Sequence, residues 1–180
     1  MKNKIETNEG FRAVLAECKK IRTEKRADYG TSWKILRASS ITDQIFIKAQ
    51  RIRTIQETKE NLVGDAIESE FMGIINYCLM ALYVLKKASV TDESIDEEVI
   101  FDTLIDDILK LLANKNHDYG EAWRSIRISS MTDQILMKLL RLRQIEDNDY
   151  KVSASEDAHA SYQDIINYAV FCLIRMKEGS

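Results

Sequence analysis

Apolar side chains recur at three- and four-residue spacing along most of the chain, which is the period of amphipathic helices. The pattern predicts six helices in two sets of three, over 10–27, 42–57, 67–87, 97–117, 132–146 and 156–177. Ser40 or Thr42 is the predicted N-cap of the second helix, because a hydroxyl there can accept a backbone N–H. No window alternates apolar and polar residues between turn signals, so we predict an all-α protein.

The two sets of helices are copies of one another. Residues 25–55 and 115–145 align at a constant offset, and 16 of the 31 aligned positions are identical. A second shared block, Ile-Ile-Asn-Tyr, follows in each copy. We therefore predict two tandem pseudo-symmetric repeats, 1–88 and 89–180, that pack as one joint domain, since each alone could bury only a modest core.

Composition narrows the class of protein. Hydrophobic residues make up 45% of the chain, charged residues 31%, and the formal net charge is −3. This profile is typical of a globular protein and argues against a general nucleic-acid or membrane binder, which would carry a basic face. The absence of proline favours helices. No run reaches about 18 apolar residues, so no membrane span is expected.

The cysteines and the N-terminal residues indicate the cellular compartment of the protein. Cys18, Cys78 and Cys172 are odd in number and form no Cys-x-x-Cys pair, which indicates buried, reduced thiols. The first ten residues contain no apolar run of a signal peptide. We therefore expect a cytoplasmic protein.

The second helix of each repeat carries a lysine within its apolar stripe. Lys48 falls on the same face as Ile45, with Arg51 one turn further along, and the second repeat has Lys138 and Arg141 at the same positions. A buried ammonium needs a partner or loses its charge. One alternative is an amine that reaches the surface or forms a structural ion pair. The other is a pair of cations that binds phosphate or carboxylate at a cleft.

An acid interrupts the apolar third helix of the second repeat. Asp164 stands where the first repeat has Gly73, whereas Glu70, one turn earlier, stands where the second repeat has Ser161. Asp164 either forms a core salt bridge with one of the two lysines or acts as a metal ligand or base. The asymmetry predicts distinct roles for the two repeats.

The motif Asp-Tyr-Gly-x-x-Trp follows the first helix of each repeat, at 28–33 and 118–123. Gly30 and Gly120 suit the positive φ that often ends a helix. The aromatic rings could simply pack over the end of the bundle. Alternatively, a ring stacks on a nucleobase while the Asp binds Mg²⁺ or a sugar hydroxyl.

Four motifs occur in both repeats: D-Y-G-x-x-W, S-S-x-T-D-Q-I-x-x-K, K-x-x-R-x-R and I-I-N-Y. In these motifs the chain resembles the nucleotide modification associated domain 1 family of bacteria and phages. That family is similar to the all-α, MazG-like nucleoside triphosphate pyrophosphatases, which bind Mg²⁺ through Glu-x-x-Glu on one helix and Glu-x-x-Asp on the next. The resemblance implies a MazG-like helical bundle and a nucleotide ligand cleaved between its α and β phosphates.

The chain departs from the metal-binding pattern of those enzymes. The Glu-x-x-Asp position is split, because the first repeat supplies Glu70 and the second supplies Asp164. Lys48 and Arg51 stand where the relatives have Glu-x-x-Glu. A cationic pair cannot ligate Mg²⁺ but can hold phosphate directly.

The leading hypothesis is a nucleotide-binding helical protein of nucleotide metabolism or modification, with Mg²⁺-dependent (d)NTP pyrophosphohydrolysis as the implied activity. The alternative is a non-catalytic helical interaction or dimerisation module. A homo-oligomer is expected in either case. The predicted catalytic residues are Asp164 and Glu70, and the predicted metal ligands are Asp164, Glu70 and Asp118. The predicted phosphate contacts are Lys48, Arg51, Lys138 and Arg141. The predicted base and sugar contacts are Asp28, Tyr29, Trp33, Asp118, Tyr119, Trp123, Asn76 and Asn167.

Overall fold

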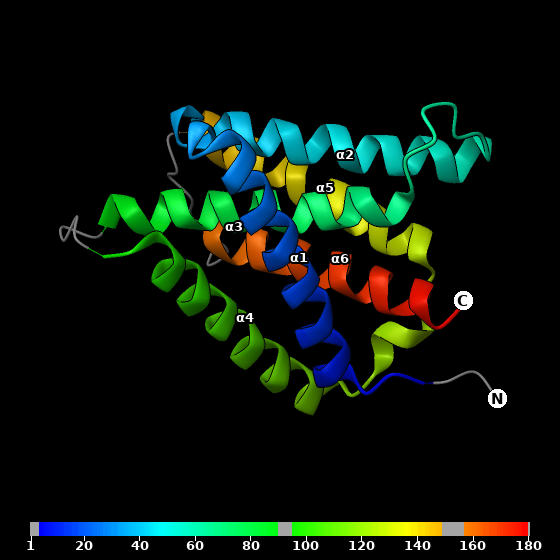
Figure 1. Ribbon diagram of the computed structural model, residues 1–180. Helices are drawn as coiled ribbons and strands as arrows, with labels where there is room; N and C mark the ends of the chain where they lie inside the picture. The colour runs from blue at the N-terminus through cyan, green and yellow to red at the C-terminus, as the bar shows by residue number, and fades with distance from the viewer. Residues whose placement is uncertain (1–3, 90–94, 149–156, 180) are drawn as a thin grey trace.

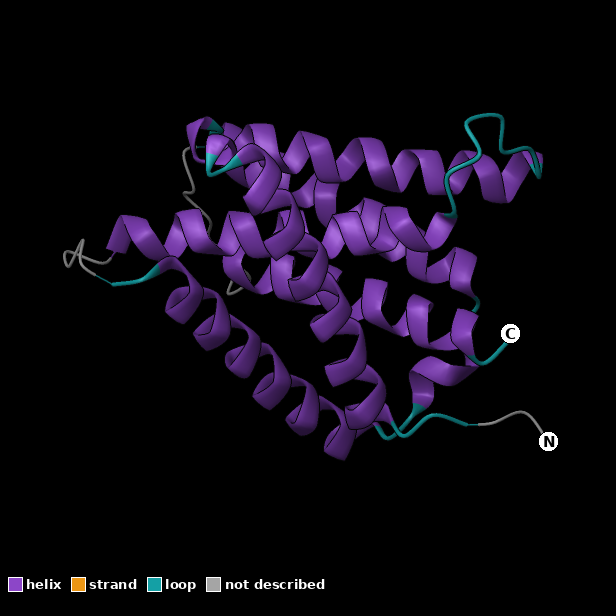
Figure 2. Ribbon diagram, viewed as in Figure 1, coloured by secondary structure: helices purple, strands orange, loops and turns teal. Residues whose placement is uncertain are grey.

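The computed structural model describes residues 4–89, 95–148 and 157–179 of the chain. Within these ranges the protein forms α-helices and two short 3₁₀ helices but no strand (Figure 2), which confirms the all-α prediction. In chain order they are α1 (Thr7–Tyr29), η1 (Ser32–Ile35), α2 (Ala38–Thr58), α3 (Ile67–Ser89), α4 (Glu97–Tyr119), η2 (Ala122–Ser125), α5 (Ile128–Asp147) and α6 (Ala158–Lys177).

Capping side chains explain where several helices begin and end. Glu6, Asp96 and Asp157 accept hydrogen bonds from backbone N–H groups in the first turns of α1, α4 and α6. Helices α1 and α4 end at Gly30 and Gly120, whose φ angles are 63° and 59°. Both glycines therefore adopt the positive φ that their position in the motif predicts.

The predicted cap of α2 was wrong. The helix begins at Ala38, so Ser40 and Thr42 lie inside it. The Thr42 hydroxyl accepts or donates at 2.7 Å from the Tyr162 hydroxyl and donates to Glu146 Oε1 at 2.6 Å. The Thr42 side chain is fully buried, so it bonds residues of the second repeat and does not cap the helix.

Helices α2, α3, α5 and α6 form a four-helix bundle (Figure 1), in which α3 packs against α2 and α6, and α5 packs against α6 and α2. The first helix of each repeat, α1 or α4, crosses outside this bundle and contacts both α3 and its counterpart. The two repeats therefore pack into a single helical bundle, as predicted.

Each crossing helix packs on the last helix of the other repeat. Phe11 of α1 meets Phe171 of α6 edge-on, with 5.7 Å between ring centroids. Phe101 of α4 stacks on Tyr83 of α3 at 5.3 Å. These aromatic contacts belong to one continuous apolar core that both repeats supply.

Helix α3 is apolar on nearly every side because it lies in the middle of the bundle. By length and composition alone it could cross a membrane, contrary to the expectation from the sequence, but half of the relevant window is buried inside the fold. Its burial against α2 and α6 accounts for its hydropathy.

The three cysteines are free and buried, in agreement with the prediction. Burial raises the pKa of Cys18 to about 12 and raises the pKa of Cys78 and of Cys172 well above the ordinary value. Thiols of this kind are structural and unreactive.

Candidate ligand-binding cleft

The first repeat contains a cavity of about 850 Å³ between α1 and α3, to which η1 and the start of α4 also contribute lining residues. This volume is typical of a site for a small organic ligand. Polar, cationic and aromatic side chains all contribute to its wall. They include Arg22, Lys25, Arg26, Tyr29, Trp33, Lys48, Glu70, Gly73, Asn76, Tyr77 and Glu97.

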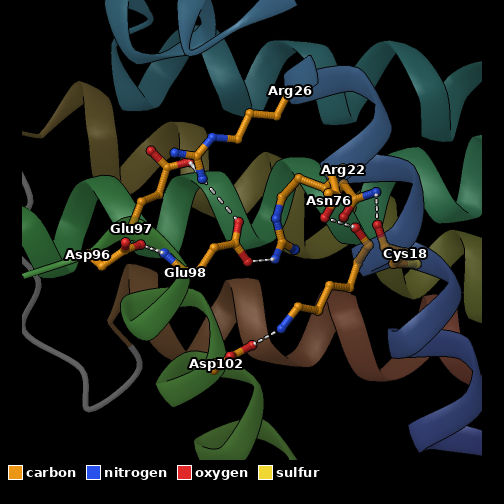
Figure 3. Close-up of polar contacts among 10 residues, drawn as sticks. Cys18, Arg22, Arg26, Asn76, Asp96, Glu97, Glu98 and Asp102 are labelled. Carbon is orange, nitrogen blue, oxygen red and sulfur yellow. Dashed lines mark hydrogen bonds and ion pairs between the residues drawn. The ribbon is translucent and has the colours of Figure 1, made fainter. Parts of the chain in front are cut away.

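Three cations of the cavity wall come from one face of α1. Arg22, Lys25 and Arg26 follow the i, i+3, i+4 spacing that places side chains together on a helix. Figure 3 shows Arg22 and Arg26 reaching from α1 toward the start of α4, where Glu98 lies 3.4 Å from a nitrogen of each. The Arg22 guanidinium also lies 4.0 Å from the ring centroid of Phe101.

Two buried side chains of the wall have unmet hydrogen-bonding capacity. Arg22 is 5% exposed, and its Nε and Nη1 have no hydrogen-bond partner. Asn76 is 7% exposed; its Nδ2 donates to the Cys18 carbonyl at 3.1 Å, which leaves Oδ1 as an acceptor without a partner. Buried polar groups are normally satisfied, so unmet donors and an unmet acceptor beside a cavity point to a ligand or ordered water.

Lys48 reaches the cavity from α2 and bonds Glu70 of α3. The Lys48 ammonium lies 3.1 Å from Glu70 Oε2, and Arg51 Nη1 lies 2.5 Å from Oε1 of the same carboxylate. Glu70 is 8% exposed. The lysine that the sequence places in an apolar stripe is therefore ion-paired, and the two cations share one buried acid.

Gly73 provides the space that Lys48 occupies. A Cβ atom at position 73 would lie 2.9 Å from Lys48 Cε and 3.0 Å from Cδ, closer than side chains normally approach. The lysine stem therefore lies directly over the backbone of α3 at this glycine.

The second repeat also contributes to this cleft. Glu97, at the start of α4, pairs with Lys34 of η1 and lies 3.8 Å from Arg26 Nη1. Burial lowers the pKa of Lys34, but its bond to Glu97 outweighs that effect, and the net pKa lies above the ordinary value. Lys34 is therefore held in its charged form beside the cleft.

Among the aromatic residues predicted to contact a base, Trp33 has the most suitable position. Its half-buried ring meets Tyr83 at 5.3 Å and lines the cavity. Tyr29 also lines the cavity but is 73% exposed. The Asp28 side chain is exposed and does not contribute to the wall. The side chain of Tyr119 lies outside the described part of the chain.

In the second repeat, large side chains stand at two of the equivalent positions. Trp123 is 6% exposed and stacks on Phe171 at 4.4 Å, where the first repeat has Met80. Asp164, in the position of Gly73, bonds Lys115 at 2.5 Å and Lys138 at 2.9 Å. Burial raises the pKa of Asp164, but its bonds to these two lysines outweigh burial and hold the pKa below the ordinary value.

The remaining residues predicted to form the site do not line the cleft. Arg141 is exposed on α5, and Asp118 is exposed next to His117. Asn167 is buried in the second repeat with its Oδ1 unpartnered. The structure thus brings Lys48, Glu70, Asn76, Tyr29 and Trp33 to one cavity.

The acids that the family resemblance assigns to Mg²⁺ do not fit a divalent cation here. Each oxygen of Glu70 faces a cation of α2, and each oxygen of Asp164 faces a lysine. Across the described ranges, no group of three or more Asp, Glu, His or Cys side chains is arranged to hold a metal ion. Oxygen ligands already neutralised by ammonium or guanidinium groups are poor Mg²⁺ donors.

Sequence reasoning missed Arg22, Lys25 and Arg26. Their spacing on one helix face is visible in the sequence, and so is the contrast with the second repeat, where Leu112 and Asn116 replace the two arginines. Comparing the two first helices position by position would have shown that the two arginines differ between the repeats, but not that they line a cavity, and Lys25 has the same residue type in both.

These observations define a duplicated all-helical protein with a ligand-sized, cation-lined cleft in its first repeat. The family model described as nucleotide modification associated domain 1 matches the chain twice, over residues 25–85 and 115–176. The chain therefore belongs to this family, in agreement with the resemblance found in its motifs. Neither the curated proteins nor the solved structures include a match.

Proposed function

We propose that the first repeat binds a nucleotide in the cleft between α1 and α3. The observation that carries the proposal is the wall of this cavity, where the buried donors of Arg22 and the Asn76 acceptor have no partner. An anionic ligand with polar edges would satisfy both. The family description, which refers to nucleotide modification, supports the same class of ligand.

The cations and the aromatic residues suit the two ends of a nucleotide. Lys25 is exposed, lines the cavity and has no ion pair within the described ranges, so it is available to a phosphate. Trp33 offers a half-buried ring for stacking on a base. Phosphate contacts from Arg22, Lys25 and Lys48 would give affinity, and Asn76 would contribute selectivity.

The proposal is limited to binding because the acids of the fold are engaged with cations. Hydrolysis between phosphates generally needs metal ions or a free base to organise the attacking water. Glu70 and Asp164 are the carboxylates predicted for this role, and both are held by cations. We therefore expect nucleotides to be bound and recovered intact.

The test is calorimetric titration of the whole chain with ribo- and deoxynucleoside mono-, di- and triphosphates, with and without Mg²⁺. Lys25→Ala should weaken binding of the preferred nucleotide by about tenfold. Arg12→Ala, which removes an exposed cation of the same helix outside the cavity wall, is the matched control and should bind like the wild type. Absence of binding at millimolar nucleotide, or release of pyrophosphate, would overturn the proposal.

Tryptophan fluorescence provides a second readout. The ring of Trp33 lines the cavity, whereas Trp123 is buried against Phe171, so a bound base should quench Trp33 selectively. The quench should persist in Trp123→Phe and disappear in Trp33→Phe. Quenching that depends on Trp123 would move the ligand to the second repeat.

A further inference from the structure

The last helices of the two repeats differ at one position, which is Asp164 in α6 and Gly73 in α3. In the second repeat, Asp164 lies between two lysines, with Oδ1 at 2.5 Å from Lys115 and Oδ2 at 2.9 Å from Lys138. Each carboxylate oxygen therefore has its own ammonium. Two ammonium groups placed in this way can bind a small anion, and in the second repeat the side chain of Asp164 is that anion.

The first repeat keeps both lysines, but its acid lies one turn earlier on the helix, where Glu70 bonds Lys48 at 3.1 Å. Lys25 and Lys48 are the equivalents of Lys115 and Lys138, both line the cavity, and Gly73 takes the place of the acid. The Lys48 side chain lies directly over Gly73. The same two lysines thus line a cavity in the first repeat, where Lys48 is held by Glu70, and share an internal carboxylate in the second.

We infer that Asp164 substitutes for a ligand phosphate, so that the phosphate of a bound nucleotide lies in the cavity beside Gly73, in contact with Lys25 and Lys48. This inference rests on the proposed function of the cleft and specifies its phosphate subsite. In the second repeat, Asp164 already occupies the equivalent subsite. We therefore expect a binding stoichiometry of one nucleotide per chain.

The charges around the two positions match the two anions. A phosphate carries about −1.5 to −2 charge at neutral pH, more than a carboxylate. The first repeat supplies two further cations, Arg22 and Arg26, beside the same cavity, whereas the second repeat has Leu112 and Asn116 there. Both arginines are ion-paired with acids at the start of α4, but Arg22 keeps two buried N–H donors without a partner, and these would be available to the larger anion.

The first experiment closes the open site. Gly73→Asp places a carboxylate between Lys25 and Lys48, and the clash it introduces falls on the flexible end of Lys48. Nucleotide binding should weaken by about tenfold or more. Gly73→Ala adds the same Cβ, with the same contact with Lys48, but no charge, and should weaken binding less than Gly73→Asp does; circular dichroism checks that both variants fold.

The second experiment opens the closed site. Asp164→Gly leaves Lys115 and Lys138 facing a space, so inorganic phosphate should raise the melting temperature of this variant more than that of the wild type. Asp164→Asn keeps the bulk of the side chain and should not gain this effect.

The outcomes separate the two proposals. If the wild type binds a nucleotide but Gly73→Asp binds it equally well, the subsite is wrong and nucleotide binding stands. If no nucleotide binds to the wild type, the proposed function fails, and the phosphate response of Asp164→Gly still decides whether Asp164 substitutes for an anion. No excess stabilisation of that variant by phosphate would refute the substitution.

Discussion

At the scale of single residues, Glu146 is a carboxylate placed among hydroxyls inside the bundle. Its Oε1 accepts from Thr42 at 2.6 Å and from Tyr162 at 3.2 Å. Burial, reinforced by Asp43 and Asp147, raises the pKa of Glu146 despite these two hydrogen bonds. Folding therefore favours the protonated form of this side chain.

The raised pKa gives a pH-dependent prediction. The Glu146 contribution to stability is fully present below the ordinary pKa of 4.5 and is lost as pH rises through the higher folded value. Glu146→Gln keeps an oxygen acceptor without the charge, so the variant should be more stable than the wild type at pH 7, by up to about 1 kcal/mol. The equivalent residue of the first repeat is already Gln56, whose amide donates to Thr132 Oγ1.

Urea unfolding at a series of pH values measures this effect. The unfolding midpoint of Glu146→Gln should exceed that of the wild type at pH 7, and the difference should shrink as pH falls toward 4.5. A lower midpoint at pH 7 would show that the charged form stabilises the fold.

At the scale of elements, Glu121 ties the segment before α1 to η2 of the other repeat. It pairs with Lys4, accepts from the Thr7 hydroxyl at 2.7 Å and lies 3.2 Å from Arg124 Nε. Its bonds to Lys4 and then Thr7 lower the pKa of Glu121 to about 2. This group stabilises the fold above its ordinary pKa of 4.5, and the contribution is lost as pH falls toward 2.

Loss of the Glu121 contacts should destabilise the first turn of α1 more than it lowers the stability of the whole fold. Lys4 and Glu121 are both more than one third exposed, so Glu121→Gln should lower global stability by less than about 1 kcal/mol. Hydrogen exchange at pH 7 should accelerate at the first-turn amides of α1, with little change in α3. Unchanged exchange in α1 would mean that other contacts, such as those of Ile5 with Glu178 and of Phe11 with Phe171, hold the start of the helix.

At the scale of the whole molecule, local patterns predicted the elements, and long-range packing decided the site. Helix periods and Gly30 predicted the secondary structure, and the lysine in the apolar stripe predicted a core salt bridge of Asp164, which forms with Lys138. The pairing of Lys48 with Glu70 was not predicted. Arg22 and Arg26 look like ordinary surface residues in the sequence. They face a cavity because α4 of the other repeat crosses beside them, and no local pattern encodes that crossing.

The same crossing predicts that neither repeat folds alone as a stable monomer. A chain of residues 1–89 would lose the cover that α6 and α4 give to α3, and would expose side chains that are now fully buried, such as Phe11 and Ile74. Leaving several such side chains in water costs about 1.5–3 kcal/mol each, comparable in total with the stability of a whole domain. Circular dichroism and size-exclusion chromatography of 1–89, of 90–180 and of their mixture measure the effect. Each fragment should be unfolded or self-associated, and mixing should restore a helical heterodimer. A monomeric fragment with cooperative unfolding would show that one repeat suffices for a core.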